Sequence, residues 1–446
     1  MGKRVRIGVF GHYGHLNLGD EAIIVALLEN IRRRRPDAEL CAFSDNPEDT
    51  RCRHGVPAFP IDRTTFVPGV SDVPPAEGHA AGSLDGGGLK ARLKEIGPLV
   101  RVVRAARGLI ATMRAIWAEA KFVPTALRSL RDVDLFIVAG SNQFLDNWGG
   151  PWGFPYRVLR WSILARLSGA KLAFMSVGAG PIDRLLSRIL ARTALLFSHY
   201  TSFRDDASRR LIESRGFRRG GAVYPDLAHS LSVADMRGTG TAPGTLRRRP
   251  TVGINPMPMF HGFYWCYPDE AKYQRYVERL AMFSARLIRE GYPVFFFGTQ
   301  KDDEETFHDV HKRLREELGE SATPDRLYRR CEHVSELMAA LASADFVVTT
   351  RFHGTVLALL AERPVLAICY YRKARDLMRE MGQTDYAIEF EDFDVDDAWR
   401  RFEILEQNRL VEQEKIRKRN VEYREALDRQ YEYVLGRLLP SVQQLS

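Results

Sequence analysis

The sequence lacks two features that would place the chain in or across a membrane. It has no uninterrupted run of the roughly 18 to 20 apolar residues that a membrane-spanning helix needs. Its first residues, MGKR, lead directly into the alternating VRIGVF, which indicates a strand and lacks the apolar core of a signal peptide. These two absences predict a cytoplasmic protein.

Cysteine is also scarce. The five cysteines are odd in number, far apart and free of any C-x-x-C spacing. A disulfide framework and a zinc site are therefore not indicated, and reduced thiols are expected.

Basic charge is concentrated in one segment. The formal net charge is +8, and residues 90–131 alone contain ten Lys and Arg against two Glu. Within residues 99–130, basic positions are interleaved with apolar ones such as Ile110 and Trp117, the pattern of a basic amphipathic helix. Such a helix either lies on an anionic membrane surface or belongs to a domain and presents a solvated basic face. No RNP-like, zinc-finger or helix-turn-helix signature is present, so nucleic acid is not an expected partner.

Short β-branched or aromatic runs alternate with helical patterns along the whole chain, as they do in parallel α/β sheets. The expected strands of the first half are 5–10, 39–43, 134–138, 171–177, 200–203 and 222–224. Those of the second half are 251–255, 293–297, 326–329, 346–349 and 364–369. The predicted fold is therefore α/β, with two Rossmann-like domains whose parallel sheets face a cleft, followed by helices at the C-terminus.

Composition divides the chain further. Residues 1–235 form the expected N-terminal domain, which contains a flexible and basic insert at about 67–131. Residues 236–250 are rich in Gly and Thr and suit a linker to a second domain at 251–385. Residues 386–446 are rich in Glu, Arg, Leu and Tyr, which predicts one or two long helices that pack across both domains.

In open parallel sheets, ligands bind at the carboxyl ends of the strands, so the loops that follow the strands are the places to search. The first of these loops, GHYGHLNLGD, contains Asn17, Gly19 and Asp20 ahead of an apolar helix. We expect Asp20 to cap that helix and the loop N–H groups to face an anion, although glycine turns at this place are often structural. The spacing fits neither G-x-G-x-x-G nor G-x-x-x-x-G-K-[ST].

The next two loops are glycine-rich and aromatic. Asn142 and Asp146 follow strand 134–138 and lead to Trp148, whose ring either stacks on a sugar or simply packs against the protein. Gly178 and Gly180 form a close-approach turn after strand 171–177. This pair of loops is therefore a candidate for one wall of a ligand-binding cleft.

In each half of the chain, an arginine follows the end of one expected strand. Arg204 follows strand 200–203 and is suited to hold a phosphate or carboxylate, while the Asp pair after it is more typical of a helix cap than of a metal site. Arg351 and His353 follow strand 346–349 and alternate with Phe352, so on an extended strand end both point to the same side. This places a permanent cation beside a group that exchanges protons near neutral pH.

These motifs resemble those of the polysaccharide pyruvyl transferase family. The matching pieces run in the family's order across about residues 5–385: Asn17-x-Gly19-Asp20-Glu21, Gly178-x-Gly180-Pro181, Phe203-Arg204-Asp205, Arg351-x-His353-Gly354, and the turn from Tyr370 to Lys373. The chain departs from the family where Gly140-Ser141-Asn142 stands in place of a triple glycine and where Thr350 replaces Ser.

The resemblance implies a glycosyltransferase-B-like fold and a role in cell-surface polysaccharide biosynthesis. It implies phosphoenolpyruvate as the donor and a saccharide diol, which becomes a ketal, as the acceptor. Arg351 and His353 would be the catalytic pair, with Arg204, Lys373 and Gly354 in the donor site. His353 is the hypothesised acid/base group. Phosphoenolpyruvate is a co-substrate, and no metal or other cofactor is expected.

Two rival functions remain open. One is a glycosyltransferase or sugar-nucleotide enzyme that uses a nucleotide-sugar on the same fold. Against it, Glu362 is followed eight positions later by Tyr370 rather than by the second Glu of a Glu-x(7)-Glu pattern. The other is a non-catalytic membrane-bound scaffold, which leaves the polar strand ends unexplained. If residues 99–130 do lie on a membrane, the enzyme would be peripheral at its inner face and the acceptor lipid-linked.

Overall fold

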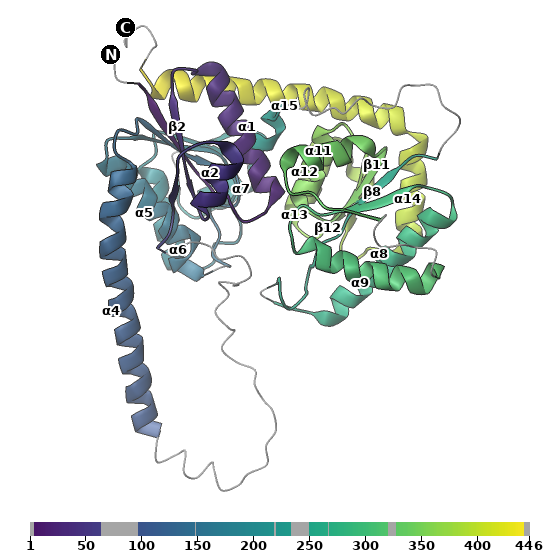
Figure 1. The fold of residues 1–446 in the computed structure, drawn as a ribbon, viewed down its shortest axis with the longest axis horizontal. Coiled ribbons are helices and arrows are strands. Elements are labelled where there is room, and N and C mark those ends of the chain that lie inside the picture. The colour runs from purple at the N-terminus through teal and green to yellow at the C-terminus, as the bar shows by residue number, and fades with distance from the viewer. Residues whose placement is uncertain are drawn as a thin grey trace.

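The protein folds into two α/β domains that lie side by side, with a long helix running along both (Figure 1). The computed structural model describes residues 4–63, 97–147, 149–217, 220–232, 249–265, 267–319 and 327–440. The first part of the predicted insert, most of the predicted linker and Trp148 lie outside these residues.

The first domain is built on a seven-stranded parallel sheet in the order β3-β2-β1-β4-β5-β6-β7. Its strands are β1 (Arg6–Phe10), β2 (Glu39–Ser44), β3 (Ala58–Pro60), β4 (Leu135–Ala139), β5 (Lys171–Val177), β6 (Tyr200–Phe203) and β7 (Ala222–Val223). The strand order reverses between β1 and β4, and in such sheets the ligand crevice lies outside the carboxyl ends of the strands at this switch point.

Both faces of this sheet are covered. All five residues of β4 are buried, and they alternate between two cores: Leu135 and Ile137 belong to one, Phe136 and Val138 to the other. This explains the continuous apolar run in the sequence, since a parallel strand buried on both faces has no polar side. The covering helices are α1 (Leu18–Arg34), α2 (Pro47–His54), α4 (Gly97–Ser129), α5 (Phe154–Leu167), α6 (Leu185–Leu196) and α7 (Asp206–Ser214).

The second domain repeats this plan with a six-stranded parallel sheet in the order β10-β9-β8-β11-β12-β13. Its strands are β8 (Val252–Asn255), β9 (Val294–Phe297), β10 (Tyr328–Arg329), β11 (Phe346–Thr349), β12 (Val365–Cys369) and β13 (Ala387–Glu389). Its helices are α8 (Glu270–Arg289), α9 (Asp303–Leu318), α11 (Val334–Ser343), α12 (Phe352–Leu360) and α13 (Arg372–Glu380). The switch point falls between β8 and β11, so β11 delivers Arg351 and His353 to the crevice.

Two edge strands were not predicted. β3 has the sequence Ala-Phe-Pro, and its proline is typical of an edge or a turn. β13 is equally short and pairs with β12, so the second sheet continues past residue 385, where the sequence placed the end of the domain. Both strands are too short to show a period of two residues.

The C-terminal segment forms α14 (Val395–Gln407) and α15 (Arg409–Leu438). Within α15, the Asn420 side chain donates to the Leu359 carbonyl of the second domain at 2.8 Å. Further along, Gln430 donates to Ser202 Oγ of the first domain at 2.5 Å and accepts from Ser176 Oγ at 3.2 Å. Therefore α15 clamps the two domains together, as the sequence favoured.

The basic segment is a single helix, α4, which extends far from the body of the first domain (Figure 1). Among its described side chains, Phe122 and Ala126 near its C-terminal end are buried, as is Leu130 just after the helix. Ile116 and Trp117 are more than half exposed, so its apolar residues do not all face a core. No helix in the described part of the chain is long and apolar enough to cross a membrane.

Candidate active site in the interdomain cleft

A cleft of about 220 Å³ lies between the two domains, at the carboxyl ends of their strands. From the first domain it is lined by Asn17, Asp20, Ser141, Asn142, Leu145, Asn147, Gly180, Pro181 and Arg204. From the second domain it is lined by Tyr264, Trp265, Thr299, Gln300, Arg351, Phe352, His353, Tyr370, Tyr371 and Lys373. The fold thus brings residues from opposite ends of the sequence into one site.

Arg351 is anchored to the floor of the cleft. It is the N-cap residue of α12, with its side chain 6% exposed, and its Nε and Nη2 both donate to Asp303 Oδ1, at 2.7 and 2.5 Å. Its Nη1 donates to the Tyr264 hydroxyl at 2.5 Å. A guanidinium has five N–H donors, and these contacts use three of them, so two remain for a ligand. Burial alone would lower the pKa of Arg351, but Asp303 outweighs it and raises that pKa above its usual value.

His353 meets the first domain at Gly19. A β-carbon at Gly19 would overlap the Cγ and Nδ1 atoms of the His353 ring, so only glycine lets α1 approach this closely. Gly354 has the same role within the second domain, because a β-carbon there would collide with Thr349 and Asn255. Both glycines therefore allow close approaches around the Arg351–His353 turn, and neither lines the cleft.

The His353 imidazole is neutral near pH 7. Burial lowers its pKa to about 4, and the charges of Arg204, Arg351 and Lys373 lower it further against the opposing effect of Asp226. Its Nε2 atom is buried and has no hydrogen-bond partner among the described residues. The sequence predicted a proton carrier with a pKa near the working pH, and the pKa of about 4 lies well below that value.

The Arg204 side chain of the first domain contacts Phe352 of the second domain. Its Nη1 donates to Asp226 at 3.0 Å and its Nη2 to Asn142 Oδ1 at 3.0 Å. Its guanidinium carbon lies 4.6 Å from the ring centre of Phe352, the residue between Arg351 and His353. Asp205, next in sequence, caps α7 by accepting from the Ser208 amide, as expected of a cap rather than a metal ligand.

Lys373 lies on the opposite wall. Its ammonium donates to Asn142 Oδ1, the same oxygen that Arg204 contacts. Burial and the charge of Arg204 lower the pKa of Lys373 to about 7. Two basic side chains from different domains therefore converge on one amide oxygen, and burial together with the charge of Arg204 makes it easier for Lys373 to lose its proton.

Asp20 lines the cleft but does not cap α1. The N-cap is Asn17, whose side chain accepts from the Gly19 amide at 3.0 Å and donates to Asp20 Oδ2 at 2.8 Å. The predicted cap was therefore three positions too late, because Asn17 and Asp20 are both good capping residues. Burial raises the pKa of Asp20 to about 7, although a hydrogen bond with Ser141 favours the ionised form.

Of the other residues predicted for the cleft, some line it and some do not. Gly180 lines the cleft, and Gly178 lies behind it, since a β-carbon there would come within 2.6 Å of Asn142 and 2.9 Å of Arg204. Asp146 does not line the cleft; its carboxylate accepts from the amides of Asp183 and Arg184 ahead of α6.

The aromatic wall of the cleft comes from the second domain. Trp265 packs against Tyr264, Tyr370 and Tyr371, with ring centres 6.2 to 6.3 Å apart. Trp152, near Trp148 in sequence, is 69% exposed and does not line the cleft. Sequence reasoning missed Trp265 because it lies in a long connection after β8 that carries no motif.

Two buried carboxylates were also missed. Asp226 and Asp303 lie behind the cleft and hold Arg204 and Arg351. Asp303 also accepts from the amides of Thr299 and Gln300, at 2.8 and 3.1 Å. An acid at the start of a helix is usually a cap, so the sequence contained no signal that Asp303 would orient Arg351.

The described residues contain one group whose side chains are spaced to hold a metal ion, namely His12, His15 and Asp45. None of the three lines the cleft. The cleft itself presents cations, amides and aromatic rings, which suit an anionic ligand joined to a polar one.

The fold and the cleft define a class: a two-domain α/β fold of the glycosyltransferase-B type, with a cation-lined cleft between the domains. Within that class, the chain belongs to the polysaccharide pyruvyl transferase family, whose model matches residues 17–372, most of the chain. The family is a family of transferases and implies a saccharide acceptor.

Solved structures share the fold at low sequence identity. S. aureus MnaA with UDP matches with a TM-score of 0.55 at 11% identity, covering 98% of this chain and 99% of that one. UDP-GlcNAc 2-epimerase from Neisseria meningitidis bound to UDP-GlcNAc gives 0.54 at 10%, covering 97% and 99%. Trehalose-6-phosphate synthase OtsA gives 0.53 at 10%, covering 98% and 99%. No curated protein matches the sequence.

Proposed function

We propose that the protein transfers a pyruvyl group from phosphoenolpyruvate to two hydroxyls of a saccharide, forming a ketal. The observation that carries this proposal is the convergence of Arg204 and Lys373 on Asn142 Oδ1. An anionic oxygen of a ligand in this place would receive the same two donors, and charge-assisted hydrogen bonds are about twice as strong as neutral ones. Arg351 supplies a third cation in the same cleft.

The donor matches this arrangement of charge. Phosphoenolpyruvate has a phosphate and a carboxylate, joined through one carbon, so a site for it needs separate cations for the two groups. An Arg guanidinium holds either group through paired hydrogen bonds, whereas Lys acts as a point charge. With Arg351 held by Asp303 and Arg204 by Asp226, two of the three cations are fixed before the ligand arrives.

Ligand charge would prepare His353 for proton transfer. Its pKa of about 4 is set by burial and by the neighbouring charges of the protein. A bound dianion stabilises the imidazolium and raises that pKa toward neutrality. The protonated imidazole then protonates the methylene carbon of the donor, and a saccharide hydroxyl attacks the adjacent carbon.

The second half of the reaction returns the site to its initial state. Phosphate leaves, and the second hydroxyl attacks the same carbon to close the ketal. The two saccharide hydroxyls release two protons in total. One returns to His353, which gave its own proton to the methylene carbon, and the other leaves with the phosphate. Asp20, whose pKa of about 7 suits proton exchange, faces the cleft from the first domain and is the second acid/base group of the proposal. No cofactor takes part.

Nucleotide-sugar chemistry is the alternative function. Two proteins of similar fold are named with UDP or UDP-GlcNAc bound. Purified protein should gain thermal stability with phosphoenolpyruvate and none with UDP-GlcNAc, because only the bound ligand shifts the folding equilibrium. Stabilisation by UDP-GlcNAc alone would support the alternative. Release of phosphate, with a pyruvyl mass gain on the saccharide, would establish the transfer.

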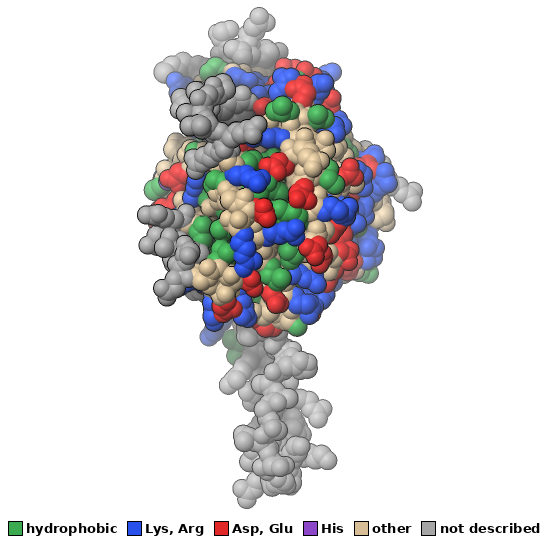
Figure 2. All heavy atoms as spheres, turned by 90° about the vertical axis from the view of Figure 1, so that its right-hand side faces the viewer, with side chains coloured by type: hydrophobic (Ala, Val, Ile, Leu, Met, Phe, Trp, Pro, Cys, Tyr) green, Lys and Arg blue, Asp and Glu red, His purple; other side chains and the backbone are tan. Residues whose placement is uncertain are grey.

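A peripheral membrane contact is part of the proposal, because exposed apolar side chains gather on α4 and α6, which both pack against α5. Those on α4 are Ile110, Met113, Ile116 and Trp117, and those on α6 are Leu185, Leu186, Ile189 and Leu196. The α6 sequence contains two Arg and no acidic residue. In contrast, the face in Figure 2 mixes acidic and basic side chains. Exposed apolar side chains on helices that also carry basic residues suit binding to an anionic membrane, which would present a lipid-linked acceptor.

The membrane contact is tested by a matched pair of variants. Ile116→Glu with Trp117→Glu should reduce binding to anionic liposomes about tenfold or more, while transfer to a soluble acceptor continues. Ile404→Glu changes an exposed apolar residue of α14 and is the control. Equal liposome binding by the wild type and the α4 variant would contradict the contact.

A further inference from the structure

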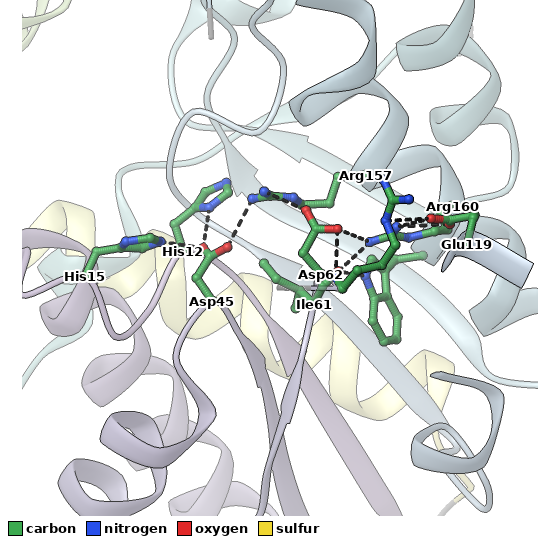
Figure 3. A network of polar contacts seen from close by, with 10 residues as sticks. His12, His15, Asp45, Ile61, Asp62, Glu119, Arg157 and Arg160 are labelled. Carbon is green, nitrogen blue, oxygen red and sulfur yellow. Dashed lines mark hydrogen bonds and ion pairs between the residues drawn. The ribbon is translucent and has the colours of Figure 1, made fainter. Parts of the chain in front are cut away.

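Outside the cleft, two histidines of the β1–α1 loop converge on one carboxylate. His12 and His15 belong to this loop, and Asp45 directly follows β2, the parallel neighbour of β1. The His12 Nδ1 atom lies 3.0 Å from Asp45 Oδ2, and His15 Nε2 lies 2.8 Å from the same oxygen. Figure 3 shows both imidazole rings directed at this carboxylate from different sides.

The three side chains form a metal-type ligand set. Each offers one ligand atom, and these atoms all lie within 4.8 Å of one another. Zinc sites with three protein ligands combine imidazole nitrogens with a carboxylate or thiolate and leave a fourth position to water. Ligand atoms about 2.0 to 2.2 Å from a shared ion lie roughly 3 to 3.5 Å from each other in tetrahedral geometry. The observed separations from Asp45 Oδ2 are close to this range, so an ion could enter with small side-chain shifts.

The carboxylate is held in place by an outer layer of charged residues. Arg157 Nη1 donates to Asp45 Oδ1 at 3.2 Å, which leaves Oδ2 facing the imidazoles. Arg157 Nη2 in turn donates to Asp62 at 2.9 Å, so the charge of this arginine is shared with a second acid. The chain of ion pairs continues through Arg160 to Glu119 of α4 (Figure 3). Such outer partners fix the orientation of a metal-binding carboxylate.

The two histidines differ in their access to solvent. His12 is nearly buried, with its ring 4.4 Å from that of Phe154, whereas the His15 side chain is 31% exposed. His15 therefore provides the open side through which an ion and a water ligand reach the site.

We propose that His12, His15 and Asp45 bind a divalent transition-metal ion of the zinc type that fixes the β1–α1 loop. This loop leads directly to Asn17, which caps α1, and to Leu18, whose amide donates to the Thr299 carbonyl of the second domain at 2.8 Å. The ion would thus stabilise one wall of the cleft while remaining outside the transfer chemistry. The proposal is independent of the identity of the donor.

Direct metal binding tests the site. Full-length protein treated with a chelator is titrated with Zn²⁺ by calorimetry and with Co²⁺ by absorption, because the Co²⁺ band reports tetrahedral geometry. We expect one ion per chain, with affinity reduced about 100-fold or more in His15→Ala, since even the loss of an outer partner reduces affinity 10- to 100-fold. His308→Ala removes an exposed histidine of α9 and should bind as the wild type does.

The choice of variant keeps the test decisive. His15 is partly exposed, so its replacement should leave the fold intact where His12→Ala, at a nearly buried position, does not. Absence of a Co²⁺ band and of Zn²⁺ heat in the wild type would show that the three residues form only a hydrogen-bonded group. Binding that persists undiminished in His15→Ala would place the ion elsewhere. Either result overturns the proposal without bearing on transfer from phosphoenolpyruvate.

Discussion

The two polar groups at the carboxyl edge of the first sheet balance their charges in opposite ways. Along the His12–Asp45 network, acids and arginines alternate from Asp45 through Arg157, Asp62 and Arg160. In the cleft, Arg204 and Arg351 each have one buried carboxylate, but Lys373 contacts only the amide of Asn142 among its hydrogen-bonding partners in the described structure.

This difference supports our proposal that the cleft binds an anion. Burial, together with the neighbouring cations, lowers the pKa of both His353 and Lys373, so an anionic ligand would stabilise their protonated forms. In the network, acids and arginines are paired with one another, and His12, His15 and Asp45 supply the metal-type ligand atoms. The carboxyl edge of the first sheet therefore borders the proposed anion site of the cleft and, by our inference, a separate cation site.

We expect the largest loss of activity from a variant that removes the proposed proton carrier of the cleft. His353→Gln should lower kcat roughly 100- to 10,000-fold, the usual contribution of general acid–base catalysis, with a small change in KM for phosphoenolpyruvate. Steady-state kinetics measure both constants, and His308→Gln serves as the control on the exposed face of α9. Normal turnover by the folded His353→Gln protein would remove this residue from the mechanism.

The next effect tests the shape of a cation rather than its charge. Arg351→Lys keeps a positive charge beside Asp303 but loses the planar fork, and kcat/KM should fall about 100-fold. Arg375→Lys, on the exposed part of α13, should leave kcat/KM unchanged. Equal loss in both variants would mean that the change acts on the whole fold.

A third effect tests how closely the domains must approach. Gly19→Ala places a methyl group where the His353 ring lies, so the two walls must separate and activity should fall about 10- to 100-fold. Gly436→Ala, in open space on α15, should instead stabilise the protein by about 0.5 to 1 kcal/mol. Activity assays and chemical denaturation distinguish the two. Wild-type activity in Gly19→Ala would show that this contact is not needed for catalysis.

The smallest effect concerns pH. Lys373 has a pKa of about 7, and a dianionic donor that binds its protonated form would raise that pKa. Affinity for phosphoenolpyruvate should therefore decrease as pH rises above 7, by about tenfold per unit at most, with proton uptake on binding. Titrations from pH 6 to 9 measure this trend, which Lys373→Arg should flatten because Arg stays protonated. A wild-type affinity independent of pH would contradict it.

Sequence reasoning succeeded where patterns are local. The two parallel sheets, most of their strands and the α4 helix follow from apolar periodicity, and the edge strands β3 and β13 escaped because they are short. The same reasoning predicted that the loops after the strands would supply the site residues. Five of the residues it named line one cleft: Asn17, Asn142, Arg204, Arg351 and Lys373. It misplaced Asp146, which serves a turn before α6, and missed the aromatic wall around Trp265.

What the sequence determined by itself is the order of the elements and the residues that each strand presents at its carboxyl end, since both depend on neighbours only a few positions apart. The tertiary structure alone decided the partners: Asp303 for Arg351, Asp226 for Arg204, Asn142 between two domains, and Asp45 between His12 and His15. It also decided the low pKa of His353, because the cost of charging an imidazole depends on burial and on cations brought together from both domains.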